Sequence, residues 1–480
     1  MSKKKKSPDC IEFLGEASHS VTGSMILIQF EGHKYLLECG LYQSSKNDYL
    51  DAYRVNSRKF DFDPAQIEYV WIGHPHIDHC GLLPRLVREG FSGTILTTEE
   101  TAQIMKPLLL NSSYLVKEEA RILSKRFGRD YAPIYSEEDV HHTLSLIQVY
   151  SEYDQIYCLD DTVRFQWLEN SHCLGAAQIQ IILSGKMKEK KILYTSDLGP
   201  IHSNNHFVRE TEIPDFFNDV VIMESTYGSP SRSNRNSRKQ DLVMLDQAIQ
   251  KTIHNHGSLV LPAFSFARTQ ELLASLYELY GHDPDFHTDI VVDSMLSVDL
   301  CRLYQNLLIN EDYLLWKEIM SWKRLKLIHE KEDSISNLAK NTSQIVISSS
   351  GFCTNGRIVD YLVKHLRDEN STICFSGYLG DNPSYLAYRI AHADQKQYLV
   401  IYHHRVPLKA NCIAMSSFSS HAPTQDLVQY ASSMKTNQIV LVHGESGAKK
   451  ELADLIRQAC SKQNRTTKVV PSAKGMMIEL

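Results

Sequence analysis

Residues 69–84 read YVWIGHPHIDHCGLLP, and this stretch decides how the rest of the chain is interpreted. The apolar run Tyr69–Ile72 predicts a buried strand, and a helix is expected to begin at Gly81. Between them lies a polar cluster made of His74, His76, Asp78 and His79. Three imidazoles and one carboxylate offer the nitrogen and oxygen ligands that suit zinc. In an extended turn residues 74 and 76 project to one side, while residues 78 and 79 can turn elsewhere, so the pattern favours two neighbouring metals over one.

Outward from this stretch, short apolar runs alternate with helical patterns along most of the 480 residues. The alternation predicts an α/β protein with substantial sheets. The predicted strands are Met25–Phe30, Tyr35–Glu38, Tyr69–Ile72, Ile192–Thr195, Val220–Met223, Leu259–Leu261, Ile290–Val292, Ile345–Ser348, Ile373–Phe375 and Ile439–Val442. The predicted helices include Asp241–His256 and Lys449–Gln463. The most polar stretch, Gly228–Lys239, is expected to be a mobile, basic surface loop, most simply a connector.

Composition narrows the class of protein. Hydrophobic residues make up 42% and charged residues 22%, a balance typical of globular proteins. The 51 Lys and Arg against 57 Asp and Glu give a net charge of −6, which excludes a polycation that coats nucleic acid and leaves room for a local basic groove. The ten cysteines include no CxxC pair, so neither a zinc ribbon nor a thioredoxin-type redox site is encoded.

The sequence also bears on the compartment. No apolar run approaches the roughly 20 residues that span a bilayer. The charged start MSKKKKSPDC has no apolar segment behind it, unlike a signal peptide. We therefore expect a cytoplasmic protein without a membrane partner.

Residues 74–79 form the HxHxDH signature of the metallo-β-lactamase fold, and other segments resemble the β-CASP nucleases, one branch of that fold. His172 in NSHCLGAAQ and Asp197 in ILYTSDLG match later ligands of the fold in the expected order. Residues 221–228 (VIMESTYG), 417–422 (SFSSHA) and 439–445 (IVLVHGE) look like the three β-CASP motifs, with Glu224, His421 and His443 as their characteristic residues. The resemblance covers almost the whole chain. The chain is similar to the compact bacterial and archaeal members of the family and to the core of the cleavage and polyadenylation endonuclease.

This resemblance implies an architecture. Residues 1–208 and 407–480 would form a metallo-β-lactamase αββα sandwich, and residues 209–406 an inserted α/β β-CASP domain. The active site would lie in the cleft between the two domains, where ligand sites often form.

The resemblance also implies roles for individual residues. One zinc would be held by His74, His76 and His172. A second would be held by Asp78, His79 and His443, with Asp197 bridging the two ions. Mn²⁺ is the alternative metal. Asp78 is expected to be indispensable for catalysis, because no other carboxylate replaces it. His421 would act as general acid toward the leaving oxygen, and Glu224 would orient it and keep it protonated.

Substrate contacts form a further expectation. Ser350 and Gly351, with Arg357 on the following helix, are candidates for a phosphate cradle, and Arg268 is another. For each arginine the alternative is an ion pair within the protein. Glu38 stands where many family members carry Asp, and we expect it to support the ligand loop by hydrogen bonding.

The leading functional hypothesis is a zinc-dependent ribonuclease that hydrolyses single-stranded RNA by a two-metal hydroxide mechanism. It would be an endonuclease, with 5′-to-3′ exonuclease activity also open. The alternatives are a DNA nuclease of the same chemistry, a metallo-hydrolase of a small ester or phosphodiester, and an inactive RNA-binding subunit. Retention of all seven ligands disfavours the last. Homo-oligomerisation, sequence preference and physiological target are left open.

Overall fold

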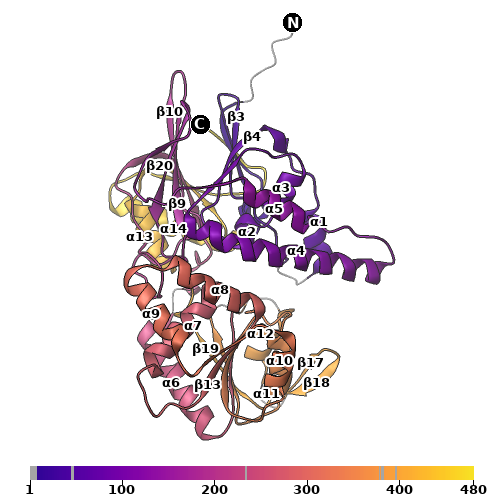
Figure 1. Cartoon of the computed structure of the whole chain (residues 1–480). Helices are drawn as coiled ribbons and strands as arrows, with labels where there is room; N and C mark the ends of the chain where they lie inside the picture. Colours follow the sequence, from indigo (N-terminus) through magenta and orange to yellow (C-terminus); the bar gives the residue numbers. More distant parts are fainter. Residues whose placement is uncertain (1–7, 45–47, 233–234, 378, 380–382, 395–396) are drawn as a thin grey trace.

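The computed structural model describes residues 8–44, 48–232, 235–377, 379, 383–394 and 397–480. Two lobes lie one above the other in Figure 1, and both described ends of the chain belong to the upper lobe. The ten predicted strands and both predicted helices overlap observed elements of the same type. The predicted αββα sandwich with an inserted α/β domain is confirmed.

Two seven-stranded sheets build the upper lobe. The first has the order β22 (Met477–Glu479), β1 (Cys10–Phe13), β2 (Ile26–Phe30), β3 (His33–Leu37), β4 (Ile67–Trp71), β5 (Thr94–Thr97) and β6 (Ile147–Val149). The second has the order β21 (Lys468–Pro471), β20 (Lys435–Val442), β11 (Phe217–Glu224), β10 (Glu189–Tyr194), β9 (Ala177–Ser184), β8 (Val163–Glu169) and β7 (Tyr157–Cys158).

The two sheets pack face to face through alternate apolar side chains. Trp71 and Ile28 from the first sheet share a buried cluster with Trp167, Ile222 and Val440 from the second. The outer face of the first sheet is covered by α3 (Leu83–Arg88), α4 (Glu99–Phe127) and α5 (Glu137–Ser145), and that of the second by α13 (Thr424–Ser433) and α14 (Ser446–Lys462). The short helices α1 (Tyr49–Asn56) and α2 (Ile77–Cys80) complete this lobe.

The lower lobe is built on a parallel six-stranded sheet. Its order is β14 (Leu325–Ile328), β13 (Asp289–Asp293), β15 (Gln344–Ser348), β12 (Leu259–Pro262), β16 (Thr372–Ser376) and β19 (Asn411–Met415). Its helices are α6 (Arg238–His254), α7 (Arg268–Tyr280), α8 (Met295–Leu307), α9 (Asn310–Ser321), α10 (Lys331–Leu338), α11 (Ile358–His365) and α12 (Leu386–Ala391). A hairpin of β17 (Tyr398–Ile401) and β18 (His404–Pro407) packs beside α11 and α12.

One helix joins the interiors of the two lobes. Met105 and Leu109 of α4 lie in the core of the upper lobe, whereas Ile104 and Leu108 belong to the cluster that fills the lower lobe. In Figure 1, α4 runs along the boundary with α8 beneath it. The two lobes are therefore joined through one helix that contributes apolar side chains to both cores.

The chain passes from the upper to the lower lobe and back again, and at both points the sheets differ from the predicted domain boundaries. The strand β11 lies in the upper lobe although it follows residue 208, and β19 lies in the lower lobe although it follows residue 406. Each crossing occurs one strand later than predicted, because β11 pairs with β10 and β19 pairs with β16.

The polar stretch Gly228–Lys239 also departs from expectation, apart from residues 233 and 234, which lie outside the described part. A 3₁₀ turn spans Pro230–Arg232, and α6 begins at Arg238 with Ser237 as its N-cap. A capping box between Ser237 and Gln240 sets this start. The segment is therefore partly helical, not a simple connector.

None of the helices in the described ranges combines the length and the apolar character needed to cross a bilayer.

Candidate metal centre and active site

The predicted metal ligands meet at one edge of the sandwich, because each follows the end of a strand. His74 and His76 come after β4, His172 after β8, Asp197 after β10 and His443 after β20. Asp78 and His79 lie on the single turn of α2 that follows the β4 loop. The ends of four separate strands, from both sheets, therefore lie together at this edge of the sandwich.

His74, His76 and His172 form a first group. Nε2 of His172 lies 3.3 Å from Nδ1 of His76. Oδ2 of Asp197 lies 3.7 Å from Nε2 of His74 and 3.8 Å from Nε2 of His172. Ligand atoms of these four residues all fall within 4.8 Å of one another, a separation that a single metal ion can span.

A second group is made by Asp78, His79 and His443. Nε2 of His443 lies 3.5 Å from Oδ2 of Asp78. Oδ1 of Asp197 lies 3.3 Å from Nε2 of His79 and 3.2 Å from Nδ1 of His443. One oxygen of Asp197 therefore faces the first group and the other oxygen faces the second, as a bridging carboxylate requires.

The donor set fits divalent cations. Within the described part of the chain, Nε2 of His74, His79 and His443 and Oδ1 of Asp197 are buried without a hydrogen-bond partner. Burial lowers the pKa of His74 and His172 well below the usual range, which favours the neutral imidazole that ligates a metal. Buried carboxylates and lone pairs gathered in this way are costly unless cations balance them.

A second layer of hydrogen bonds orients the ligands. Oε1 of the fully buried Glu38 accepts from the Ser196 hydroxyl at 2.9 Å and from the backbone N–H of Gly73 at 3.2 Å, and it lies 3.4 Å from Nδ1 of His79. The Ser196 hydroxyl also contacts Nδ1 of His74 at 2.9 Å. Glu38 thus reaches both ligand groups, in the supporting position expected from the sequence.

Three residues of this centre have left-handed backbone. The φ angles are 60° at Glu38, 52° at Ser196 and 48° at His443. Such conformations are unfavourable for residues with a Cβ and persist where the surroundings impose them. Close packing surrounds the last of them: a Cβ on the next residue, Gly444, would lie 2.4 Å from the Ser225 hydroxyl oxygen, so this position has no room for a side chain.

His421 and Glu224 meet beside the first ligand group. Nδ1 of His421 lies 3.2 Å from Oε1 of Glu224, whose carboxylate also accepts from the backbone N–H groups of Leu198 and Thr226. Burial lowers the pKa of His421, but the charge and hydrogen bond of Glu224, together with the charge of Asp197, outweigh it and raise that pKa above its usual value. The His421 ring lies 4.7 Å from that of His172, centroid to centroid.

The two arginines predicted to contact phosphate both donate hydrogen bonds within the protein. The Arg357 guanidinium donates to Asp293 at 2.8 Å and to the His329 carbonyl at 2.7 Å, so it forms the internal ion pair that was the alternative. This pair balances the charge of the fully buried Asp293, and a phosphate contact by Arg357 stays a prediction. Arg268 donates to the Ser376 carbonyl, and burial lowers its pKa to about 10.

Ser350 and Gly351 form part of a tight loop after β15. The Ser350 hydroxyl accepts from the backbone N–H of Thr354 at 3.1 Å, and Gly351 packs against the Phe264 ring. A phosphate contact by these two residues stays a prediction.

Sequence reasoning missed the residues that hold the His421 loop. The carboxylate of Asp241, fully buried in the first turn of α6, accepts from the backbone N–H groups of Ser416 at 2.8 Å and Ser417 at 2.6 Å. Arg235 donates to the His421 carbonyl at 3.1 Å and lies over the Tyr227 ring. A basic segment expected to be a connector is thus an anchor of the loop, and no local pattern in the sequence signals it.

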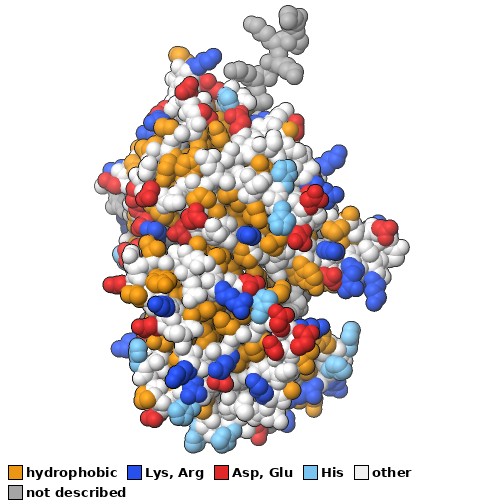
Figure 2. Space-filling view, viewed as in Figure 1, with side chains coloured by type: hydrophobic (Ala, Val, Ile, Leu, Met, Phe, Trp, Pro, Cys, Tyr) orange, Lys and Arg blue, Asp and Glu red, His pale blue; other side chains and the backbone are white. Residues whose placement is uncertain are grey.

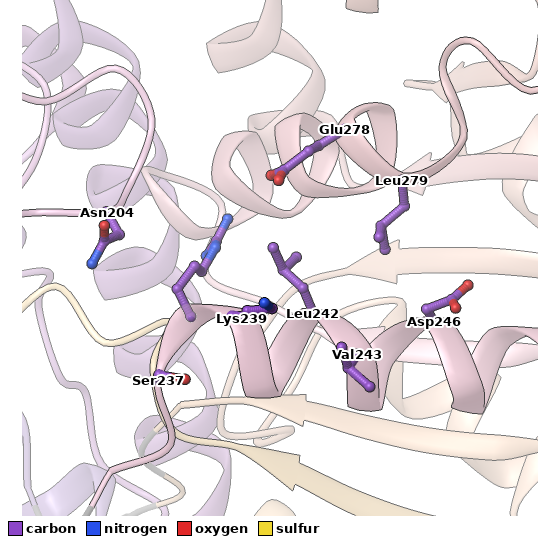
Figure 3. A pocket seen from close by; sticks show the side chains of 9 residues that line it. Asn204, Ser237, Lys239, Leu242, Val243, Asp246, Glu278 and Leu279 are labelled. Carbon is purple, nitrogen blue, oxygen red and sulfur yellow. The ribbon is translucent and has the colours of Figure 1, made fainter.

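One hollow of the surface lies away from the centre. An open groove of about 500 Å³ runs between α6 and α7 and is lined by Leu242, Val243 and Leu279, with charged residues at its rim (Figure 3). None of the predicted site residues lines it. On the face drawn in Figure 2, Lys and Arg side chains are interspersed with Asp and Glu over both lobes.

Family models match separate parts of the chain. A model of the metallo-β-lactamase superfamily matches residues 21–152, a β-CASP domain model matches residues 269–383, and a model described as a Zn-dependent metallo-hydrolase RNA specificity domain matches residues 405–469. The chain belongs to the β-CASP nucleases. Like other β-CASP nucleases, it is a metal-dependent hydrolase.

Several named relatives align with most of the chain. The chain is 27% identical to ribonuclease TTHA0252 of Thermus thermophilus over 89% of its own length and 92% of that protein. It is 25% identical to cleavage and polyadenylation specificity factor 73 of Drosophila melanogaster, but spans 59% of that longer protein. An RNase J-like protein of Methanocaldococcus jannaschii is 25% identical over 80% of the chain and 83% of that protein. A solved structure from Enterococcus faecalis, of unknown function, shares the fold with a TM-score of 0.54 at 12% identity, covering 99% of this chain and 100% of that one.

Proposed function

We propose that this β-CASP nuclease is a zinc-dependent ribonuclease that hydrolyses phosphodiester bonds of single-stranded RNA. It acts as an endonuclease, and the same centre also supports 5′-to-3′ exonuclease activity. The observation that carries the proposal is the placement of Asp197, with one oxygen toward His74 and His172 and the other toward His79 and His443. Two ligand groups that share a carboxylate suit a pair of metal ions.

Two zinc ions bound there would supply Lewis acidity and a water acidic enough to attack phosphorus at neutral pH. The chain itself supplies the proton. Because Nδ1 of His421 is engaged by Glu224, Nε2 is the nitrogen that donates to the leaving 3′-oxygen. Glu224 is held in turn by two backbone N–H groups, so the donor has a fixed direction.

The choice of RNA rests on the relatives and on the matched domain. Two of the three named relatives carry "ribonuclease" or "RNase" in their names, and the RNA specificity model spans both His421 and His443. The net charge of −6 is consistent with a local groove for the strand, without a surface that binds nucleic acid in bulk.

The test uses RNA and DNA strands of identical sequence, labelled at either end and incubated with protein reconstituted with Zn²⁺ or Mn²⁺. Internal fragments from RNA alone are the expected result, and mononucleotides released from the 5′ end would add the exonuclease mode. Equal cleavage of DNA would establish the alternative DNA nuclease. Hydrolysis of a small ester or phosphodiester with both polymers left intact would overturn the proposal.

A further inference from the structure

Three aromatic residues gather at one edge of the lower lobe. Phe264 follows β12, Phe352 follows β15 and Tyr385 follows β16, and these strands are neighbours in the parallel sheet. Their carboxyl ends therefore open onto the same edge. Ligands of open parallel sheets bind at that edge, outside the carboxyl ends of the strands.

The three rings form a packed unit with one open member. The rings of Phe352 and Tyr385 are stacked, with centroids 4.8 Å apart and planes 15° apart. Phe264 meets Phe352 edge-on, with centroids 5.1 Å apart. The Phe264 side chain is 45% exposed, although its neighbours Ala263 and Phe266 are buried.

The backbone around Phe264 is fixed. Its carbonyl accepts from both the backbone N–H and the hydroxyl of Thr269, the latter at 2.8 Å. On the other side the ring rests on the loop backbone, since a Cβ on Gly351 would lie 3.0 Å from it. An exposed phenyl ring held in place at both ends is suited to stacking, because little side-chain freedom is lost when a flat ligand lands on it.

This edge faces the metal centre. The ring of Phe266, two residues after Phe264, lies 5.4 Å from that of His76, centroid to centroid. The Tyr385 hydroxyl donates to the Ser44 carbonyl of the upper lobe at 3.3 Å, so the aromatic unit lies where the lobes meet. A strand whose phosphate reaches the metal ligands has its flanking bases close to this unit.

We propose that Phe264 forms a stacking subsite for one unpaired nucleobase next to the scissile phosphate, and that Phe352 and Tyr385 hold its ring in place. The inference rests on the proposed nuclease function and adds how the protein binds the RNA strand next to the cleavage site. Stacking on an aromatic face tolerates every base and requires an unpaired one. The subsite therefore favours single strands with little regard for sequence.

The test measures binding in the slow variant His421→Ala, which cleaves little RNA during the measurement, by fluorescence anisotropy of a labelled oligoribonucleotide. Phe264→Ala is expected to weaken binding by about 5–100-fold, the range for loss of one stacked base. Phe264→Trp is expected to retain affinity, and its indole emission should be quenched by RNA. Tyr402→Ala removes an aromatic residue that is 56% exposed on the β17–β18 hairpin, and serves as the matched control.

A set of oligonucleotides, each with one abasic position, locates the stacked base. At one position the missing base should abolish the difference in affinity between the parent and its Phe264→Ala variant. That difference should be the same at low and high salt, because stacking releases no counterions. Equal binding by Phe264→Ala and its parent, or a penalty that no abasic position removes, overturns the subsite alone when the wild type cleaves RNA. A wild type that neither binds nor cleaves RNA overturns the proposed function as well.

Discussion

Nδ1 of His421 lies 3.2 Å from Oε1 of Glu224, so two residues 197 positions apart in the sequence form one ion pair at the junction of the lobes. Glu224 is fully buried, whereas the His421 side chain keeps 22% of its surface exposed. The carboxylate thus acts from inside the protein on a ring that still reaches a substrate.

From this pair we expect His421→Ala to slow RNA cleavage by about 10²–10⁴-fold with metal content unchanged. Glu224→Gln should resemble it, because the amide no longer stabilises the charged ring. An aryl phosphodiester, whose leaving group needs no proton, should be hydrolysed at nearly the wild-type rate by both variants. Turnover on the two substrates, measured beside elemental analysis, checks this. Equal losses on both substrates would assign His421 a structural or ligand role.

The second ligand group gives a contrasting prediction. Wild-type protein should contain close to two metal ions per chain, mostly zinc. Asp78→Ala and His443→Ala should each bind the second ion at least about 10–100-fold more weakly, the loss seen for outer-layer changes. Competition with a chelator of known affinity measures this. Should His443→Ala keep both ions while His421→Ala loses one, the two histidines have exchanged roles.

Glu38 tests the supporting layer. In Glu38→Gln the side chain no longer carries the charge that contacts His79 and the Ser196 hydroxyl, so metal affinity should fall by about 10–100-fold. Excess Zn²⁺ should restore turnover, since no ligand atom has been removed. Glu189→Gln, an exposed change on β10, is the matched control and should leave affinity unaltered. Turnover that stays low at saturating metal would contradict a purely supporting role.

Asp241 tests the anchor of the His421 loop. In Asp241→Asn the backbone N–H groups of Ser416 and Ser417 lose their anionic acceptor, so the ring of His421 loses its fixed position. We expect turnover on RNA to fall by roughly 10–100-fold, as misplacement of a catalytic group by about 1 Å can cause. Metal content and aryl phosphodiester hydrolysis should be kept. Asp333→Asn, in the exposed first turn of α10, is the control. A parallel loss on both substrates would make Asp241 a general stability residue.

The cluster at residues 74–79 could be predicted from the sequence because its signal is local, whereas the sandwich, the inserted lobe and the later ligands were predicted from the resemblance to the β-CASP nucleases. At residues 69–79, an apolar run followed by closely spaced histidines predicts both the strand and the metal ligands. The long-range pairings that were not predicted have a different origin. Arg357 is drawn to the buried Asp293, 64 residues earlier in the sequence, and Asp241 is drawn to a loop 175 residues later. Neither pairing leaves a periodic or spaced pattern, so only the folded chain reveals it.

Because α4 packs into the cores of both lobes, it limits which segments of this protein can be exchanged with those of a relative. Ile104 and Leu108 belong to the cluster that fills the lower lobe, while the adjacent Met105 and Leu109 belong to the upper one. An insertion grafted alone from a relative would set foreign side chains against Ile104 and Leu108, with a mismatch in the centre of the new interface. We therefore expect a chimera to fold well only when α4 is exchanged together with the inserted segment, although the two are separated in the sequence.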